Sequence, residues 1–240
     1  TTATIGRFDY FLNNGMMIDS TLNGVNFAFG NVLKADLFYG KDNNTDAWGN
    51  DIDVTPMTYL TVAGLGLKYD TSKATTLNGG YYQFKDNNTT GVLNELSGNT
   101  DNKMKVWETG FTTKFTKNWA LSASYGASDA DTENKAYYAE FAYKGADKSK
   151  VGSYGAWVNY RNLEAAAAPK TTFDGAYTAY GQIDYANEIG YGAKGYEIGF
   201  NYTPMLNTVL QVKYVETKES AVGASNEKSK FIRAQAEFFF

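Results

Sequence analysis

The chain has 240 residues, with 22 basic and 26 acidic side chains and neither cysteine nor histidine. The absence of both residue types excludes a disulfide framework, a thiolate or histidine-bound zinc site, and a Ser–His or Cys–His nucleophile. The net charge of −4 argues against a nucleic-acid partner, which usually requires a basic surface. No segment reaches the roughly 18 apolar residues of a transmembrane helix. A β-barrel remains compatible with a membrane, because its alternating strands average to a hydrophilic composition.

An alternation of apolar and polar residues with a period of two dominates the chain. In residues 119–127, Trp119, Leu121 and Tyr125 share one face, while Ser122 and Ser124 share the other. This period is typical of strands and incompatible with amphipathic helices. The sequence therefore predicts an all-β fold. The predicted strands span residues 3–11, 24–30, 32–41, 57–70, 75–86, 103–116, 118–129, 134–145, 149–161, 192–203, 206–217 and 228–240.

The connections between these strands alternate between short and long. Tight links fall at 30–31, 71–74, 116–118, 145–148 and 203–206, and longer polar segments at 12–23, 42–56, 87–102, 130–133, 162–191 and 218–227. Outer-membrane barrels show this asymmetry, with short periplasmic turns and longer external loops. We therefore predict that residues 1–240 form one transmembrane antiparallel up-and-down β-barrel domain, surrounded by the lipids of a bacterial outer membrane.

Aromatic residues near the strand ends support a membrane location. Tyrosine and tryptophan favour the membrane–water interface, because ring and polar tip suit different media. The predicted girdle residues are Tyr69, Trp119, Tyr143, Tyr202 and Tyr214.

The C-terminus is the most specific feature of the sequence. The last strand is amphipathic, with Arg233 and Glu237 on one face and Phe238 and Phe240 on the other. An amphipathic last strand that ends in phenylalanine resembles the signal by which outer-membrane barrels are recognised for insertion. We therefore assign that signal to Phe238 and Phe240.

Charged side chains recur at the inward-facing positions of the strands. Together they predict a water-filled interior, because unpaired charge is costly in a packed lumen. A high count of small inward residues favours an open lumen: Gly64, Gly66, Gly110, Ser122, Ser124, Gly126, Gly155 and Gly199. The charges either shape the ion selectivity or merely hydrate the lumen, and both signs occur. The predicted pore-lining residues are Lys34, Asp36, Glu108, Lys114, Glu140, Lys144, Arg161, Glu197, Lys213, Arg233 and Glu237.

Two long loops carry weaker signals. The acidic residues of 42–53 faintly suggest a calcium loop, but Ala47 and Asp53 stand where an EF-hand needs glycine and glutamate. We therefore predict no metal or other cofactor. In the longest loop, 162–191, the alanine-rich residues 163–168 predict one or two helical turns. This loop either folds into the lumen or covers the outer rim.

Several segments resemble a known family. Residues 4–10 (Thr-Ile-Gly-Arg-Phe-Asp-Tyr) and 15–20 (Gly-Met-Met-Ile-Asp-Ser), the run Tyr-Arg-Asn-Leu at 160–163 and the terminal Phe240 resemble the porin barrel of OmpM-type major outer-membrane proteins of diderm Firmicutes such as Veillonella. In that family an SLH domain and a coiled-coil stalk bind cell-wall polymers, and the porin is a homotrimer of about sixteen strands. This sequence shows neither the SLH domain nor the stalk. The resemblance therefore implies missing N-terminal strands, and the alternative is a smaller barrel.

These features predict a general-diffusion porin that passes small hydrophilic solutes and ions without a chemical step. Selection among solutes would come from the radius of the pore and from the electrostatic field of the residues that line it. One alternative is a structural barrel that serves mainly as an anchor. Others are a membrane-barrel enzyme, disfavoured by the lack of histidine, and a soluble β-sandwich that binds carbohydrate through exposed aromatic residues.

Overall fold

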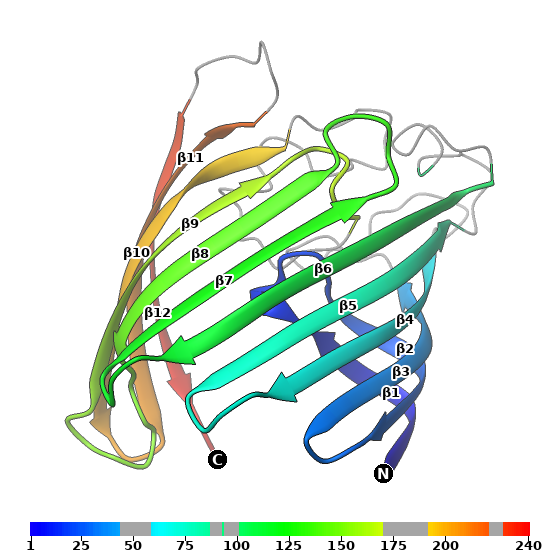
Figure 1. Cartoon of the computed structure of the whole chain (residues 1–240). Coiled ribbons are helices and arrows are strands. Elements are labelled where there is room, and N and C mark those ends of the chain that lie inside the picture. Colours follow the sequence, from blue (N-terminus) through cyan, green and yellow to red (C-terminus); the bar gives the residue numbers. More distant parts are fainter. Residues whose placement is uncertain (44–58, 87–92, 94–100, 170–191, 221–227) are drawn as a thin grey trace.

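The computed structural model describes residues 1–43, 59–86, 93, 101–169, 192–220 and 228–240 (Figure 1). One antiparallel sheet contains twelve strands in chain order, each paired with its sequence neighbours. The predicted all-β, up-and-down arrangement is confirmed. In the described residues, no helix is long and apolar enough to cross a membrane. The strands are β1 (Thr2–Phe11), β2 (Asp19–Phe29), β3 (Leu33–Asn43), β4 (Tyr59–Asp70), β5 (Thr75–Asp86), β6 (Lys103–Lys114), β7 (Trp119–Ser128), β8 (Lys135–Lys144), β9 (Tyr154–Leu163), β10 (Ala193–Met205), β11 (Thr208–Glu219) and β12 (Lys228–Phe238).

The register between strands keeps each kind of side chain on one face. Trp119 pairs with Tyr143 on the outer face, and Ser122 pairs with Glu140 on the inner face. A slip of one residue would move every apolar side chain to the opposite face, so the alternation fixes the register.

The sheet curves into most of a cylinder, with both termini at the same end (Figure 1). We call this the short-turn end, because the β2–β3, β4–β5, β6–β7, β8–β9 and β10–β11 connections lie there, and the opposite end the long-loop end. Strands β1 and β12 form the two edges of the sheet, and no ladder joins them. Within a bilayer each edge would require a hydrogen-bonding partner, because lipid cannot satisfy backbone N–H and C=O groups.

Aromatic rings form two bands on the outer face. Near the short-turn end, the Trp119 ring lies 4.6 Å from that of Tyr143, whose ring lies 6.2 Å from Tyr154. We call this group the lower band. A second group, the upper band, contains Tyr125, Tyr137 and Tyr196. It lies six residues, or roughly 20 Å, further along the strands toward the long-loop end. All five predicted girdle residues lie on the outer face, and Tyr214 belongs to the upper band.

The charges of the outer face are confined to the long-loop end of the strands. Between the aromatic bands and below them, the outward positions of the described strands are apolar, aromatic or uncharged. The outward charged residues are Arg7, Asp9, Asp19, Lys41, Lys85, Lys103, Lys105, Lys135, Lys194, Glu216, Lys218, Lys228 and Lys230.

Two strand boundaries differ clearly from the prediction. Strand β9 begins at Tyr154 rather than at 149, because Asp147 organises a longer turn: its carboxylate accepts hydrogen bonds from the backbone N–H and hydroxyl of Ser149. Strand β2 begins at Asp19 rather than at 24. The predicted polar loop 12–23 is therefore wrong, and a short turn takes its place.

Candidate channel interior

Residues 12–18, which we call the inward turn, connect β1 to β2 and fold onto the inner face of the sheet. The turn contains a short 3-10 element, η1 (Asn13–Gly15), in which Asn13, Asn14 and Gly15 have φ values of 46°, 60° and 69°. Asparagine and glycine tolerate this left-handed region better than other residues. The Gly15 N–H donates to the Leu12 carbonyl at 2.8 Å and closes the turn. The sequence signal for it is Asn-Asn-Gly before the apolar run at 16–18.

The apolar run of the inward turn is completely buried against the barrel wall. Met16, Met17 and Ile18 are 1%, 0% and 0% exposed. The Ser124 hydroxyl lies 3.4 Å from the Met16 sulfur, and a Cβ built at Gly126 would lie 2.9 Å from the sulfur of Met17. Glycine at 126 therefore makes room for the turn.

The expectation that small inward residues keep the lumen open is wrong at three of the glycines, Gly64, Gly126 and Gly199, whereas Ser122 and Ser124 line a cavity. A Cβ at Gly64 would clash with the Phe38 ring, and one at Gly199 would clash with the Trp157 ring. Together with Gly126, these positions receive bulky inward side chains. The sequence pattern gave the face of each glycine correctly but not what covers it.

A buried carboxylate anchors the inward turn to the wall. Asn13 Nδ2 donates to one oxygen of Glu108 at 2.9 Å, and the Tyr82 hydroxyl donates to the other at 2.7 Å. Glu108 is only 2% exposed. Two hydrogen-bond donors offset part of the cost of burying this carboxylate. Glu108 thus faces inward as predicted, but it holds the turn in place instead of lining open space.

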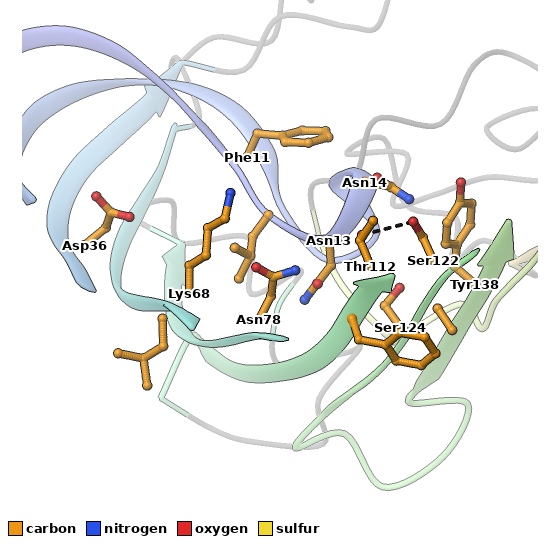
Figure 2. A pocket seen from close by; sticks show the side chains of 14 residues that line it. Phe11, Asn13, Asn14, Asp36, Lys68, Asn78, Thr112, Ser122, Ser124 and Tyr138 are labelled. Atoms are coloured by element: carbon orange, nitrogen blue, oxygen red, sulfur yellow. Dashed lines mark hydrogen bonds between the residues drawn. The ribbon is translucent and has the colours of Figure 1, made fainter. Parts of the chain in front are cut away.

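A polar cavity of about 250 Å³ lies beside the inward turn (Figure 2). Asp36, Lys68 and Asn78 lie toward one side of the view, and Thr112 and Ser122, whose hydroxyls are 3.0 Å apart, toward the other. Such a lining suits water and small polar solutes. Lys68 was not among the predicted lining residues, although it pairs with Lys34 on the inner face.

The inner face of β8–β11 carries a network of paired charges. Lys213 Nζ lies 3.1 Å from Glu197, and both side chains are largely buried, at 12% and 6% exposure. Glu197 also accepts hydrogen bonds from Trp157 Nε1 at 2.7 Å and Asn159 Nδ2 at 3.3 Å. This wall is therefore polar and closely hydrogen-bonded.

Arg161 extends the polar network toward β8. Its guanidinium lies 5.0 Å from the centre of the Tyr138 ring, and the Tyr138 hydroxyl donates to Glu140 at 2.6 Å. Asn159 Nδ2 lies 3.4 Å from the same Glu140 carboxylate. The structure thus brings the predicted residues Arg161, Glu140 and Glu197 together.

The remaining predicted lining residues are less buried. Lys34 forms an ion pair with Asp70 at 3.2 Å. Gln235 donates to Glu237 at 2.6 Å. Lys114 and Arg233 occupy exposed inward positions, with Arg233 opposite Lys213.

Lys144 departs from its predicted inward position. Its backbone is left-handed, with a φ of 50°, because the strand ends there. Its ammonium lies 5.1 Å and 4.9 Å from the ring centres of Tyr143 and Tyr154, which belong to the outer face. Lys144 therefore lies at the outer rim instead of lining the interior.

The first residues of the longest loop pack against the wall. Residues 165–168 are buried, and the Ser128 hydroxyl donates to the Ala166 carbonyl at 2.5 Å. The Ala167 N–H donates to the Glu164 carbonyl at 3.0 Å, which closes a single hydrogen-bonded turn; the predicted helical turns are not formed in residues 163–168. Residues 170–191 lie outside the described part of the chain.

The faint calcium signal falls on residues 42–53, of which only 42 and 43 are described. The Asp42 carboxylate accepts a hydrogen bond from Ser20 at 3.0 Å. Within the described ranges, no cluster of three or more acidic, histidine or cysteine side chains could hold a metal ion.

No protein-family model and no curated protein matches the sequence. Solved structures are similar in fold. OccK3 (OpdO) of Pseudomonas aeruginosa superimposes with a TM-score of 0.54 at 11% identity, over 97% of this chain and 71% of that chain. OprB of Pseudomonas putida superimposes with a TM-score of 0.52 at 12% identity, over 92% of this chain and 60% of that chain. At these identities the likeness establishes the fold alone, which is that of the outer-membrane β-barrels.

Proposed function

We propose that the chain forms the wall of a channel in a bacterial outer membrane that passes small hydrophilic solutes and ions. The observation that carries the proposal is the distribution of polarity over the sheet. The inner face holds paired charges and a polar cavity, and the outer face holds apolar residues between two aromatic bands. A soluble barrel would have the opposite arrangement, because its polar face would contact water.

Transport in this proposal is passive and involves no chemical step. The inward turn fills part of the cross-section beside β5–β7, so solutes pass along the charged wall of β8–β12. Glu197 and Lys213 neutralise each other, and Arg161 and Arg233 contribute positive charge to the lining. Because acidic residues such as Glu140 and Glu237 also face inward, we propose general diffusion with weak ion selectivity.

The twelve-stranded sheet is not closed into a barrel. The edges of β1 and β12 are unpaired with each other, and we propose that further strands join them and complete a wider barrel. Barrels of sixteen to eighteen strands leave an aqueous channel, whereas barrels of about eight are filled by their own side chains.

Single-channel recording in planar bilayers tests the proposed function. We expect the purified protein to give discrete conductance steps, and liposomes that contain it to swell in small sugars but not in large ones. A protein that inserts into the bilayer without producing steps would contradict the channel.

The alternative is a structural barrel with little channel activity. It is favoured by the apolar cluster on the inner face near the long-loop end, where Leu22, Phe84 and Val106 pack with the inward turn. Normal insertion with neither conductance nor swelling would support this function.

Assembly and tethering rest on the resemblance to the OmpM-type porins. We propose a homotrimer, which light scattering of the detergent-solubilised protein would detect as three times the chain mass. Attachment to cell-wall polymer would require an SLH domain, as in the OmpM-type porins. A pull-down with purified cell wall should therefore fail with this chain and succeed with a chain that carries the domain.

A further inference from the structure

Three lysines form a row across the outer face at the long-loop end. Lys194 of β10 pairs in register with Lys218 of β11, which pairs in register with Lys228 of β12. We call these three residues the basic row. Like charges directly opposite each other on neighbouring strands are destabilising. The row therefore favours an anion that bridges its members.

One carboxylate accompanies the basic row without neutralising it. Glu216 lies 2.7 Å from Lys228 Nζ and 3.5 Å from Lys230 Nζ. It also accepts hydrogen bonds from the hydroxyls of Tyr196 and Tyr214, at 3.2 Å and 3.0 Å. Among the described outward residues of this patch, four lysines against one glutamate leave a net positive charge of three.

A groove of about 160 Å³ lies along the basic row. Its lining combines all three lysines with the ring-bearing residues Tyr160 and Tyr196. Lys194 precedes Tyr196 of the upper aromatic band by two residues and lies nearer to the long-loop end of β10. The row thus lies roughly 7 Å beyond that band along the strand. The headgroups of the adjacent leaflet lie at this level when the aromatic band marks the membrane interface.

We propose that the basic row binds the phosphate group of an anionic lipid in the leaflet at the long-loop end. The lipid phosphate lies among Lys194, Lys218 and Lys228, and the acyl chains extend over the apolar outer residues Val158, Ile198 and Ile232. These side chains are exposed on the same face, between the basic row and the lower aromatic band.

A lipid fits the observations better than a free anion or a second copy of the chain. A free anion would use the lysines but would leave the apolar surface below them without a partner. A second copy packed by two-fold symmetry would bring its own basic row to this face and increase the repulsion. Only an amphipathic anion matches both the charge and the apolar surface.

Native mass spectrometry of the whole chain in detergent tests the proposal with three probes: phosphatidic acid, phosphatidylcholine and inorganic phosphate. We expect phosphatidic acid to bind at least roughly tenfold more tightly than phosphatidylcholine. Inorganic phosphate at the same concentration should not displace it. Equal binding of the two lipids, or full displacement by inorganic phosphate, would overturn the proposal.

The variant that removes the site is the triple substitution Lys194→Gln, Lys218→Gln and Lys228→Gln. At roughly fivefold per lysine, its affinity for phosphatidic acid should fall about a hundredfold. The matched control is Lys73→Gln, Lys117→Gln and Lys148→Gln, which makes the same charge change in exposed turns at the short-turn end. The control should keep the affinity of the unmodified chain.

An equal loss of lipid affinity in the control would show that the effect depends on overall charge alone, and it would overturn the proposal. If the triple variant fails to fold, the single variant Lys218→Gln should still weaken binding about fivefold. A triple variant that changes oligomeric mass but keeps its lipid affinity would identify a subunit interface instead. The proposal does not rest on conductance, so a protein that gives no conductance steps would leave it unaffected.

Discussion

The inner faces of β1–β7 and β8–β12 carry different chemistry on one continuous sheet. On β1–β7, the inward turn buries Met16, Met17 and Ile18, and the charge next to it, Glu108, accepts hydrogen bonds from neutral groups. On β8–β12, charged residues such as Glu197 and Lys213 pair with each other. Period-two alternation is the same in both regions. The difference therefore comes from what packs on the strands.

We therefore expect the two walls to have different roles around the lumen. In the proposed channel, the inward turn on the β1–β7 wall narrows the lumen, and the paired charges of the β8–β12 wall border the space that is left. Substitutions in the first region should change pore size, whereas substitutions in the second should change ion preference and stability.

The largest expected effect concerns the buried pair on β10 and β11. Lys213→Met removes the positive partner of Glu197 and should lower the free energy of unfolding by about 3–5 kcal/mol, because an uncompensated carboxylate remains buried. Urea unfolding of the barrel in lipid vesicles measures this loss. Adding Glu197→Gln should restore much of the stability. A double variant no more stable than Lys213→Met would show that the pair is not coupled.

A smaller effect is expected at the anchor of the inward turn. In Glu108→Gln, the new amide can accept only one of the hydrogen bonds from Asn13 and Tyr82, which should cost roughly 1–3 kcal/mol. Hydrogen exchange at residues 12–18 should accelerate while the β-strands remain protected. Glu140→Gln, on the other wall, is the control and should leave this exchange unchanged. Unaltered exchange in Glu108→Gln would contradict its role as an anchor.

The arginines of the second wall should affect selectivity more than stability. Neutralising both Arg161 and Arg233 by substitution with glutamine should shift the cation-to-anion permeability ratio toward cations, on the order of twofold. The reversal potential in a salt gradient reports this shift. Lys68→Gln, beside the cavity of the first wall, should shift it less. An unchanged reversal potential in the double variant would show that these arginines do not contribute to the electrostatic potential of the pore.

The smallest effect lies outside both walls, in the β8–β9 turn. Hydrogen bonds from the hydroxyl and backbone N–H of Ser149, together with the ion pair to Lys150 at 3.0 Å, lower the pKa of Asp147 from 3.8 to about 2. Because this pKa is lowered in the folded state, the carboxylate stabilises the turn above about pH 4, and the contribution is lost as the pH falls toward 2. NMR titration of the Asp147 carboxyl carbon should show this midpoint. In Ser149→Ala the midpoint should move back toward 3.8, and an unmoved midpoint would refute the assigned cause.

The strands could be predicted from the sequence because period-two alternation is a local signal. The faces of Glu108, Arg161 and Glu197 followed from it directly. Their depth of burial did not, because it depends on partners far along the chain: Asn13 is 95 residues from Glu108. Lys144 was misplaced since the alternation does not show where a strand ends.

The inward turn was the main feature that local patterns missed. Asn-Asn-Gly at 13–15 marks a tight turn, but its destination depends on the space left by Gly126 and on the donors and acceptors of β5–β7. A pattern that covers only a few neighbouring residues does not contain such long-range complementarity.

Single-channel conductance of the chain and of a variant that lacks the inward turn tests the central claim most directly. The variant replaces residues 12–18 with Asn-Gly, which can form a two-residue hairpin loop between β1 and β2. If the lumen is a channel narrowed by this turn, both proteins produce discrete steps and the variant has the larger conductance, by roughly twofold. Silent bilayers with both proteins, each inserted and folded, would contradict the claim.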